Sequence, residues 1–481
     1  MKEQRIRTYS AYINGERVVS SSGKTMDVIN PATEEIFARV PQCTAEDARR
    51  AIAAAKAAQK QWAKLPAIER SVCLKKLAAK LRELGETLGR IITSEQGKPL
   101  SVATGEAVWG ADLMEYHAEW ARRIEGEIIQ SDSIDENIML YKVPIGVVSC
   151  ILPWNFPLYV LIRKLSPALV TGNTVVVKPS SETPCSALEL AKLLDAVELP
   201  PGVVNIVPGS GSEVGIELAA HPDVGVVTLT GSTTAGQHVM RACSDNITKV
   251  SLELGGKAPA IVMDDADLDL AVECIKGGRI SNAGQVCNCV ERVYVQDGIA
   301  DVFIDRITQA MQRVTIGNGI EDSEMGPLIS KEALESVHTK VQQALADGAV
   351  LACGGERSKR FKKGYFYEPT VLTNCRQDMK IMQEEIFGPV MPIMTFKSID
   401  EAIKLANDCK YGLTSTLYTT SYRAAMQFAN EIESGELYIN RQQGEAYQGF
   451  HAGWKLSGIG GDDGKHGLES FLRTRVVYMK Y

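Results

Sequence analysis

An α/β fold built on a parallel sheet is predicted by three features of the chain. Between residues 147 and 260, short apolar runs alternate with turns and helical stretches, a pattern typical of parallel strands covered by helices on both faces. A second αβ region follows from Ile261 onward. The 481 residues, 45% of them hydrophobic, are enough to bury at least two cores of ordinary domain size. We therefore expect two or more domains, interleaved because no repeat or flexible linker divides the chain.

The residues before this sheet are predicted to form a hairpin and then helices. An Asn-Gly pair between two short strand-like runs indicates a β-hairpin at residues 12–18. Thr44 and Asp47 have the spacing of a capping box ahead of an Ala-rich segment. We expect helices to follow one another as far as about Glu127.

Two more strand-like segments lie outside the alternating region. Residues 136–150 are apolar but interrupted by Pro144 and Gly146, which indicates an edge ribbon that leads into a buried strand. The tail, residues 474–481, reads as a bare strand. Because a strand with unpaired backbone groups usually pairs with another strand, we expect a partner subunit.

The residues that follow each apolar run are the first candidates for ligand contacts, because ligands of parallel sheets bind beyond the carboxyl ends of the strands. The glycines at 209, 211 and 215 are spaced one residue too widely for the usual dinucleotide motif, and residues 231–236 lack the Lys-Ser/Thr of a phosphate loop. Ordinary strand-to-helix turns are the alternative. The repetition of glycine-containing turns at one edge of the predicted sheet favours a nucleotide-binding site. The candidate turns are residues 153–157, 178–181, 208–211, 230–232 and 253–257.

Cys287 is the candidate nucleophile. It lies in a short glycine-containing loop ahead of an alternating strand-like run. Backbone amides and a polar neighbour such as Asn288 can stabilise the thiolate, which is the reactive form of cysteine. The alternative is that Cys287 is simply a small buried hydrophobe.

Glu253 and Asn155 could supply what a thiolate nucleophile needs. Glu253 ends an apolar strand, where its surroundings would raise its pKa and suit it to act as a general base; a salt bridge with Lys257 is the alternative. Asn155, held between prolines, could donate its amide to an oxyanion together with the backbone N–H of Cys287.

Composition excludes several partners and indicates a compartment. A net charge of −7 with no long basic run argues against binding to nucleic acid or to an anionic membrane. The eleven cysteines are scattered without a repeated spacing, as in reduced intracellular proteins, and none has the spacing of a zinc site, so no metal is expected. No apolar run approaches a membrane span or a signal h-region. We expect a cytoplasmic protein.

Six motifs together resemble the NAD(P)-dependent aldehyde dehydrogenase superfamily, in its order and at about its spacing, over essentially the whole chain. They are Pro-Trp-Asn-Phe-Pro (153–157), Val-Lys-Pro-Ser (177–180), Thr-Gly-Ser (230–232), Leu-Glu-Leu-Gly-Gly-Lys (252–257), Gly-Gln-Val-Cys (284–287) and Glu-Glu-Ile-Phe-Gly-Pro (384–389). The resemblance implies a variant Rossmann cofactor domain, an αβ catalytic domain and a small β ribbon for oligomerisation as a dimer of dimers. The cofactor domain would comprise residues 1–130 and 148–256. The catalytic domain would comprise residues 257–446, and the oligomerisation ribbon residues 131–147 and 463–481.

The resemblance also implies roles for the candidate residues. Cys287 would attack the aldehyde, Asn155 and the Cys287 amide would hold the oxyanion, and Glu253 would activate water to hydrolyse the thioester. Lys178 would bind the adenosine ribose of NAD or NADP, and Glu385 the nicotinamide ribose. The remaining residues expected around the cofactor are Leu152, Trp154, Ser180, Ser181, Gly211, Gly215, Gly231, Ser232, Leu254 and Phe387.

One departure from the family pattern bears on the choice of cofactor. Where many NAD-preferring members carry a Glu, three residues after the cofactor lysine, this chain has Ser181, with Glu182 one residue later. A hydroxyl brings no charge that would repel a 2′-phosphate, so NADP stays open. If Glu182 takes over the ribose contact, NAD is preferred.

The expected substrate pocket is unusually polar, which suits a short hydroxylated aldehyde. Its residues, Tyr159, Arg163, Asn288, Glu445 and His451, are similar to those of the family members that oxidise lactaldehyde and glycolaldehyde. A structural role is the alternative for each of them, such as pairing of Arg163 with an acid on a neighbouring helix. The rival functions are a semialdehyde dehydrogenase in which Arg163 grips a carboxylate, a CoA-acylating enzyme, and a non-catalytic binding or structural protein.

Overall fold

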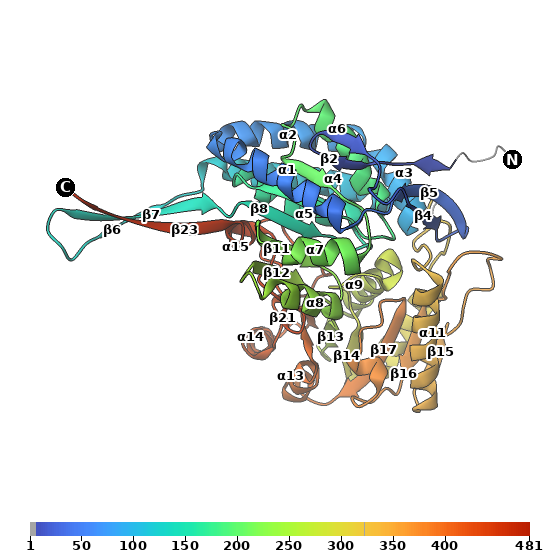
Figure 1. The fold of residues 1–481 in the computed structure, drawn as a ribbon. Helices are drawn as coiled ribbons and strands as arrows, with labels where there is room; N and C mark the ends of the chain where they lie inside the picture. The colour runs from blue at the N-terminus through green and yellow to red at the C-terminus, as the bar shows by residue number, and fades with distance from the viewer. Residues whose placement is uncertain (1–5, 322) are drawn as a thin grey trace.

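An eight-stranded sheet forms the centre of the first lobe (Figure 1). In chain order its strands are β2 (Ala11–Ile13), β3 (Glu16–Val18), β8 (Val147–Ile151), β9 (Thr174–Lys178), β10 (Val204–Ile206), β11 (Val224–Thr230), β12 (Lys249–Glu253) and β22 (Gly458–Ile459). The five central strands are parallel, in the order β12-β11-β8-β9-β10. The parallel sheet predicted from the alternating pattern is therefore confirmed, and antiparallel strands complete it at both edges.

Helices cover both faces of this sheet. They are α1 (Ala45–Lys64), α2 (Ala67–Glu83), α3 (Gly85–Gln96), α4 (Leu100–Glu119), η1 (Trp120–Arg122), α5 (Pro157–Val170), α6 (Cys185–Ala196), η2 (Gly211–Gly215), α7 (Ile216–Ala220), α8 (Thr233–Cys243) and α15 (Gly464–Glu469). Successive residues of a strand point to opposite faces, so Val148 packs with α2 to α6 while Val147 packs with α1, α7 and α8. Each face thus has its own apolar core.

Local signals in the first 50 residues are confirmed. Asn14 and Gly15 both have positive φ, 55° and 80°, and join β2 to β3 as the predicted hairpin. The capping box of Thr44 and Asp47 is present at the start of α1.

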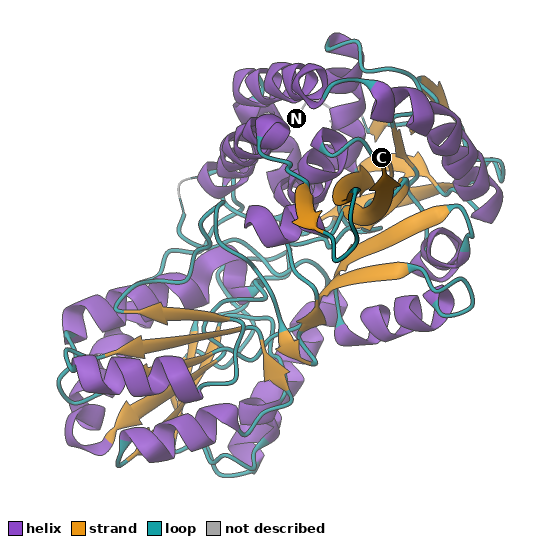
Figure 2. Cartoon of the chain, turned by 90° about the vertical axis from the view of Figure 1, so that its left-hand side faces the viewer, coloured by secondary structure: helices purple, strands orange, loops and turns teal. Residues whose placement is uncertain are grey.

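The second lobe is built on a seven-stranded sheet, visible as a separate layer between helices in Figure 2. Its strands are β13 (Pro259–Val262), β14 (Arg292–Gln296), β15 (Val350–Cys353), β16 (Thr370–Thr373), β17 (Val390–Phe396), β19 (Thr414–Tyr418) and β20 (Glu436–Ile439). Only β15, at one edge, is antiparallel to its neighbour. The helices of this lobe are α9 (Leu268–Ile280), η3 (Ser281–Gly284), η4 (Asp297–Ile299), α10 (Ala300–Gln312), α11 (Lys331–Ala346), α12 (Lys380–Gln383), α13 (Ile399–Asn407) and α14 (Tyr422–Glu431).

A three-stranded ribbon projects from the first lobe (Figure 1). It consists of β6 (Glu127–Gln130), β7 (Glu136–Pro144) and β23 (Leu472–Lys480), in the order β23-β7-β6. The ribbon begins at Glu127 rather than at residue 131, because β6 pairs with β7. The C-terminal strand pairs within the chain, along the whole of β7, so its pairing by itself does not indicate a second subunit.

Two smaller sheets complete the fold. The strands β1 (Arg7–Thr8), β4 (Thr25–Asn30) and β5 (Glu35–Pro41) form one of them, and β18 (Tyr411–Gly412) with β21 (Trp454–Lys455) forms the other. After the second lobe, the chain therefore returns through β21 and β22 to the edge of the first sheet.

The computed structural model describes residues 6–321 and 323–481, so the first five residues of the expected cofactor domain lie outside it. All eleven cysteines are among the described residues, and all are free thiols. None of the helices described is both long and apolar enough to cross a membrane.

Candidate active site

The loop that carries Cys287 has an unusual backbone. It follows three consecutive residues with positive φ, Asn282 at 47°, Ala283 at 56° and Gly284 at 74°. Arg279, fully buried on α9, holds this turn by donating to the carbonyl oxygen of Gly284 at 2.5 Å. The strained turn brings the loop against the end of β12, where a Cβ on Gly256 would clash with the carbonyl oxygen of Cys287.

Two thiols lie in this loop, and their surroundings differ. The side chain of Cys287 is partly exposed, whereas Cys289 is buried. Burial raises the pKa of Cys289 to about 12, and its sulfur donates to the carbonyl oxygen of Val286 at 3.0 Å. Because a thiol reacts as its thiolate, Cys287 is the only one of these two suited to nucleophilic chemistry.

Asn155 lies beside the cysteine loop, as its expected role requires. Its side-chain nitrogen donates to the carbonyl oxygen of Gln285 at 3.0 Å. Its own carbonyl oxygen accepts from the Nζ of Lys98 at 2.5 Å and from the Nδ2 of Asn282 at 3.1 Å. The turn before α5 is thus tied both to the helical layer and to the cysteine loop.

Glu253 ends β12, and its side chain is almost fully buried. Neither carboxylate oxygen accepts a hydrogen bond from the residues that the structure describes. Burial raises the pKa of Glu253 to about 8. The alternative of a salt bridge with Lys257 is wrong, because Lys257 pairs with Glu291 at 2.9 Å. A buried carboxyl that accepts no hydrogen bond and titrates near neutral pH is typical of a general base.

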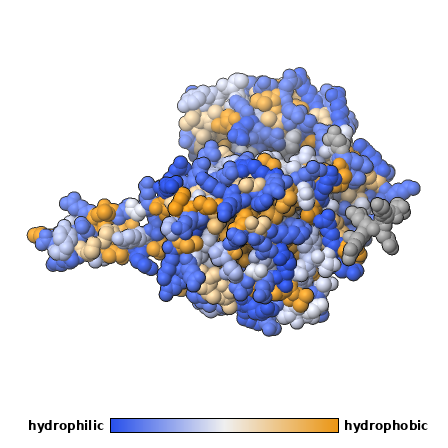
Figure 3. Space-filling model, turned by 90° about the horizontal axis from the view of Figure 1, so that it is seen from above, coloured by the Kyte–Doolittle hydropathy of each residue, from blue (hydrophilic) through white to orange (hydrophobic). Residues whose placement is uncertain are grey.

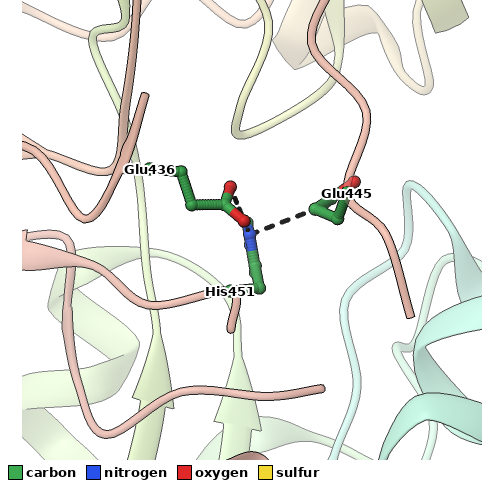
Figure 4. A group of neighbouring side chains, drawn as sticks. All are labelled: Glu436, Glu445 and His451. Atoms are coloured by element: carbon green, nitrogen blue, oxygen red, sulfur yellow. Dashed lines mark hydrogen bonds and ion pairs between the residues drawn. The ribbon is translucent and has the colours of Figure 1, made fainter. Parts of the chain in front are cut away.

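His451 lies beside Glu253 and contacts two further carboxylates, Glu436 and Glu445 (Figure 4). The ring is buried, with Nε2 3.6 Å from Oε2 of Glu253. Nδ1 lies 3.0 Å from Oε2 of Glu436, the first residue of β20, and 3.3 Å from Oε1 of Glu445. Sequence analysis found His451 and Glu445 but missed Glu436, which nothing in its local sequence distinguishes.

The charge of this cluster is balanced by cationic side chains. Burial alone would lower the pKa of His451, but the negative charges of Glu445 and Glu253 raise it well above the ordinary value. The pKa of Glu445 falls to about 2 despite burial, because His451 and Arg163 lie beside it. The polar atoms of Glu436, Glu445 and His451 lie within 4.8 Å of one another, a spacing that a cation could fill, but the imidazolium and Arg163 already supply positive charge there.

Arg163 is committed to acids of its own chain. Its Nη2 lies 2.8 Å from Asp463 and 3.4 Å from Glu445, and its guanidinium lies 5.0 Å from the ring centre of Tyr159. Arg163 therefore makes the structural ion pairs that the alternative predicted, although the acids come from two loops and not from a neighbouring helix. Asn288 is buried in the cysteine loop, where its carbonyl oxygen accepts from the hydroxyl of Thr414 at 2.9 Å.

The expected cofactor residues fall into two groups. One group lies at the carboxyl ends of the parallel strands, where the Nζ of Lys178 donates to the carbonyl oxygen of Pro179 at 3.0 Å. Burial lowers the pKa of Lys178 to about 8. Gly215 faces the stem of Lys178, and the space beside the Cα of Gly211 is open. Leu152, the residue after β8, is buried and donates its N–H to the carbonyl oxygen of Lys178 at 3.0 Å.

The serines and the Thr-Gly-Ser turn of this group bond mainly to the backbone. Ser180 accepts from the N–H of Glu182 at 3.3 Å, and the hydroxyl of Ser181 donates to Gly209 at 3.2 Å. Gly231 donates its N–H to the carbonyl oxygen of Glu253 at 2.9 Å. Ser232 caps α8 by accepting from the N–H of Ala235.

The second group lies where the two lobes meet, with Glu385 and Phe387 from the second lobe and Trp154 and Leu254 from the first. Glu385 is partly buried, accepts the N–H of Gly256 at 2.9 Å, and has its pKa raised to about 7 by desolvation. The rings of Phe387 and Trp154 meet edge to face, with centres 5.4 Å apart. Leu254, directly after Glu253, packs against Gly236 on α8.

Comparison with known proteins agrees with this fold. The aldehyde dehydrogenase family model matches residues 18–477. The chain therefore belongs to the aldehyde dehydrogenase family and is an enzyme of aldehyde oxidation.

Individual members of the family are similar along nearly the whole chain. Lactaldehyde dehydrogenase of Escherichia coli is 53% identical over 98% of both chains; its crystal structure covers 99% of this chain and 100% of its own, with a TM-score of 0.97. The mitochondrial succinate-semialdehyde dehydrogenase of Arabidopsis thaliana is 42% identical, over 97% of this chain and 88% of its own. Betaine aldehyde dehydrogenase of Staphylococcus aureus in complex with NAD+ is 39% identical, over 98% and 94%, with a TM-score of 0.96.

Proposed function

We propose that the enzyme oxidises a short hydroxylated aldehyde to its carboxylic acid through a covalent bond to Cys287. The thiolate attacks the carbonyl carbon to form a thiohemiacetal, whose oxyanion accepts from the side-chain amide of Asn155 and the N–H of Cys287. After oxidation to the thioester, Glu253 takes a proton from water. The water oxygen attacks the carbonyl carbon, the carbon–sulfur bond breaks, and the thiolate of Cys287 is restored.

The observation that carries this proposal is the meeting of three distant segments. Asn155 contacts the cysteine loop through Gln285, and Gly256, three residues after Glu253, contacts the backbone of Cys287. Nucleophile, oxyanion donor and base therefore come from one neighbourhood, which is the arrangement that acyl transfer requires.

We propose that NAD or NADP binds between the two groups of cofactor residues. Lys178 has one acceptor among the described residues, so its other N–H groups can bind ribose hydroxyls, and the open space at Gly211 allows a phosphate to approach the backbone. Glu385 would hold the nicotinamide ribose. When bound, the nicotinamide supplies the hydride acceptor for oxidation of the thiohemiacetal. The related betaine aldehyde dehydrogenase structure contains NAD+.

The residues expected beside the adenosine ribose, Ser181 and Glu182, are compatible with either NAD or NADP. Ser181 is partly exposed and uncharged, whereas Glu182 is exposed beside it. We propose that Ser181 tolerates a 2′-phosphate. The substitution Ser181→Glu should then lower kcat/KM for NADP relative to NAD, because a carboxylate there repels the phosphate. An unchanged ratio of the two kcat/KM values would remove Ser181 from cofactor selection.

The pocket lining supports a short hydroxylated substrate such as lactaldehyde or glycolaldehyde. His451, Glu445 and Arg163 form a polar surrounding that would suit a hydroxylated substrate, and the 53% identical relative is a lactaldehyde dehydrogenase. For the semialdehyde rival, Arg163 would have to leave Asp463 and Glu445 to hold a substrate carboxylate. We expect kcat/KM to be higher for lactaldehyde and glycolaldehyde than for succinic semialdehyde; the reverse order would favour the rival.

The substitution Cys287→Ser tests the proposed chemistry. It should abolish aldehyde oxidation and leave cofactor binding near normal, because the hydroxyl is a far weaker nucleophile than the thiolate. Cys73→Ser, which changes another partly exposed thiol on α2, is the matched control and should keep its activity. Aldehyde oxidation by the Cys287→Ser variant at the rate of the control would defeat the proposal.

We also propose that the ribbon joins subunits into a homo-oligomer, arranged as a dimer of dimers. Apolar side chains are exposed on it, among them Ile128 at 78% and Tyr478 at 67%, and Figure 3 shows hydrophobic surface on the projecting arm. A thin sheet with apolar side chains open to water is stabilised when a second subunit covers it.

A further inference from the structure

We propose that Glu436 is a positioning residue for the base: through Nδ1 of His451 it fixes the orientation of the imidazole ring so that Nε2 faces Glu253. The inference deepens the proposed function and rests on it, since it assumes that Glu253 activates water.

The backbone hydrogen bonds of His451 fix the position from which its side chain extends. His451 and Asp462 form an isolated antiparallel bridge, in which each N–H donates to the carbonyl oxygen of the other residue, at 3.0 and 2.8 Å. The side chain of His451 is therefore aimed from a fixed point, and the groups at its two ring nitrogens decide its orientation.

Glu436 is the better anchored of the two carboxylates at Nδ1. It belongs to β20, which pairs with β19, and its Oε2 accepts from the hydroxyl of Tyr438 at 3.0 Å. Glu445 lies in a loop and is shared with Arg163. The shorter distance, 3.0 Å against 3.3 Å, also favours Glu436 as the acceptor that holds the ring (Figure 4).

With a carboxylate at Nδ1 and another facing Nε2, the ring is stable when both nitrogens carry protons. An imidazolium 3.6 Å from Glu253 favours the ionised carboxylate, which is the form that can accept a proton from water. Glu436 would thus act on Glu253 through His451, without touching substrate.

Other charged groups also act on the pair, and a pH profile reflects all of them. Arg163 and Lys164 on α5 favour ionisation of Glu253, whereas Asp462 opposes it. The charged and titratable groups that face His451 are Glu253, Cys287, Glu436, Glu445, Asp462 and Asp463.

The test is the pH dependence of thioester hydrolysis in Glu436→Gln. Loss of the carboxylate should free the ring to turn, so that Nε2 no longer faces Glu253, and the limb in which the steady-state rate rises with pH should move upward by about one unit. Glu431→Gln is the matched control, since it removes an exposed carboxylate at the end of α14, and its limb should not move. An unmoved limb in Glu436→Gln overturns the inference.

A double-mutant comparison ties the effect to the ring. His451→Gln should shift the limb by the same amount as Glu436→Gln, and the double variant should shift it no further, because both changes take the imidazolium away from Glu253. Additive shifts would show that Glu436 acts independently of His451 and would contradict the inference. The pre-steady-state burst of NADH or NADPH with lactaldehyde separates failure of this inference from failure of the proposed function. If Glu436→Gln gives a burst but its pH profile is unchanged, the role of Glu436 is rejected. If the wild type gives no burst, the proposed function is rejected.

Discussion

At the scale of single residues, the burial of Glu253 has a direct consequence for the pH dependence of turnover. With a pKa of about 8, roughly one carboxyl in ten is ionised at pH 7. Because only the ionised form can act as a base, we expect the steady-state rate to rise between pH 7 and 9 with a midpoint near 8. A rate that is constant over this range, or a midpoint near the ordinary carboxyl value, would contradict the proposed role of Glu253.

The catalytic candidates could be named from the sequence because each lies in a short motif with a chemical reason. Cys287 sits in a glycine-containing loop, Asn155 between prolines, and Glu253 at a strand end. Glu436 and Asp463 could not be found this way, because their importance comes from partners distant in the chain, His451 and Arg163. The sequence also could not predict that Lys257 pairs with Glu291 and not with Glu253, because these partners are distant in the chain.

At the scale of elements, a buried ion pair holds the turn that carries Asn155. The Nζ of Lys98, after α3, lies 2.6 Å from Glu106 on α4, with both side chains fully buried. Lys98 also donates to the carbonyl oxygen of Asn155. The second oxygen of Glu106 accepts the N–H groups of Leu158 and Tyr159 at the start of α5. One pair thus fixes both ends of the turn.

The substitution Lys98→Met should destabilise the fold by ~3–5 kcal/mol, because it leaves Glu106 as a buried charge without its cation. Lys80→Met is the matched control: Lys80 lies at the same 2.6 Å from its partner, Glu83, but both side chains are well exposed, so a loss of ~0–1 kcal/mol is expected. Urea unfolding measures both. Equal losses in the two variants would mean that burial of the Lys98 pair adds nothing.

Most elements followed from local patterns, whereas the edges of the sheets did not. The hairpin, the capping box and the parallel strands each have a signal of a few residues. The two-residue strand β22 joins β12 at residues 252 and 253, across about two hundred residues of chain. No local pattern predicts such a return, and neither does one predict that the tail strand pairs with β7.

At the scale of the whole molecule, the ribbon should decide the assembly state. Tyr478 is 67% exposed on β23, on the strand at one free edge of the ribbon. A charge placed there by Tyr478→Glu should reduce the sedimentation coefficient, because an apolar interface does not tolerate an unpaired carboxylate. Tyr422→Glu on α14, where the tyrosine is 79% exposed, is the matched control and should sediment like the wild type. The proposal of a ribbon-mediated oligomer fails if both variants sediment alike.

The covalent thioester on Cys287 can be observed directly by mass spectrometry of the Glu253→Gln variant mixed with lactaldehyde and NAD+ or NADP+. Loss of the base should slow hydrolysis but not acylation, so we expect one burst of reduced cofactor and an added lactoyl group on the peptide that contains Cys287. A variant that gives the burst but carries the added mass on another residue, or on none, would contradict a mechanism through this thiol.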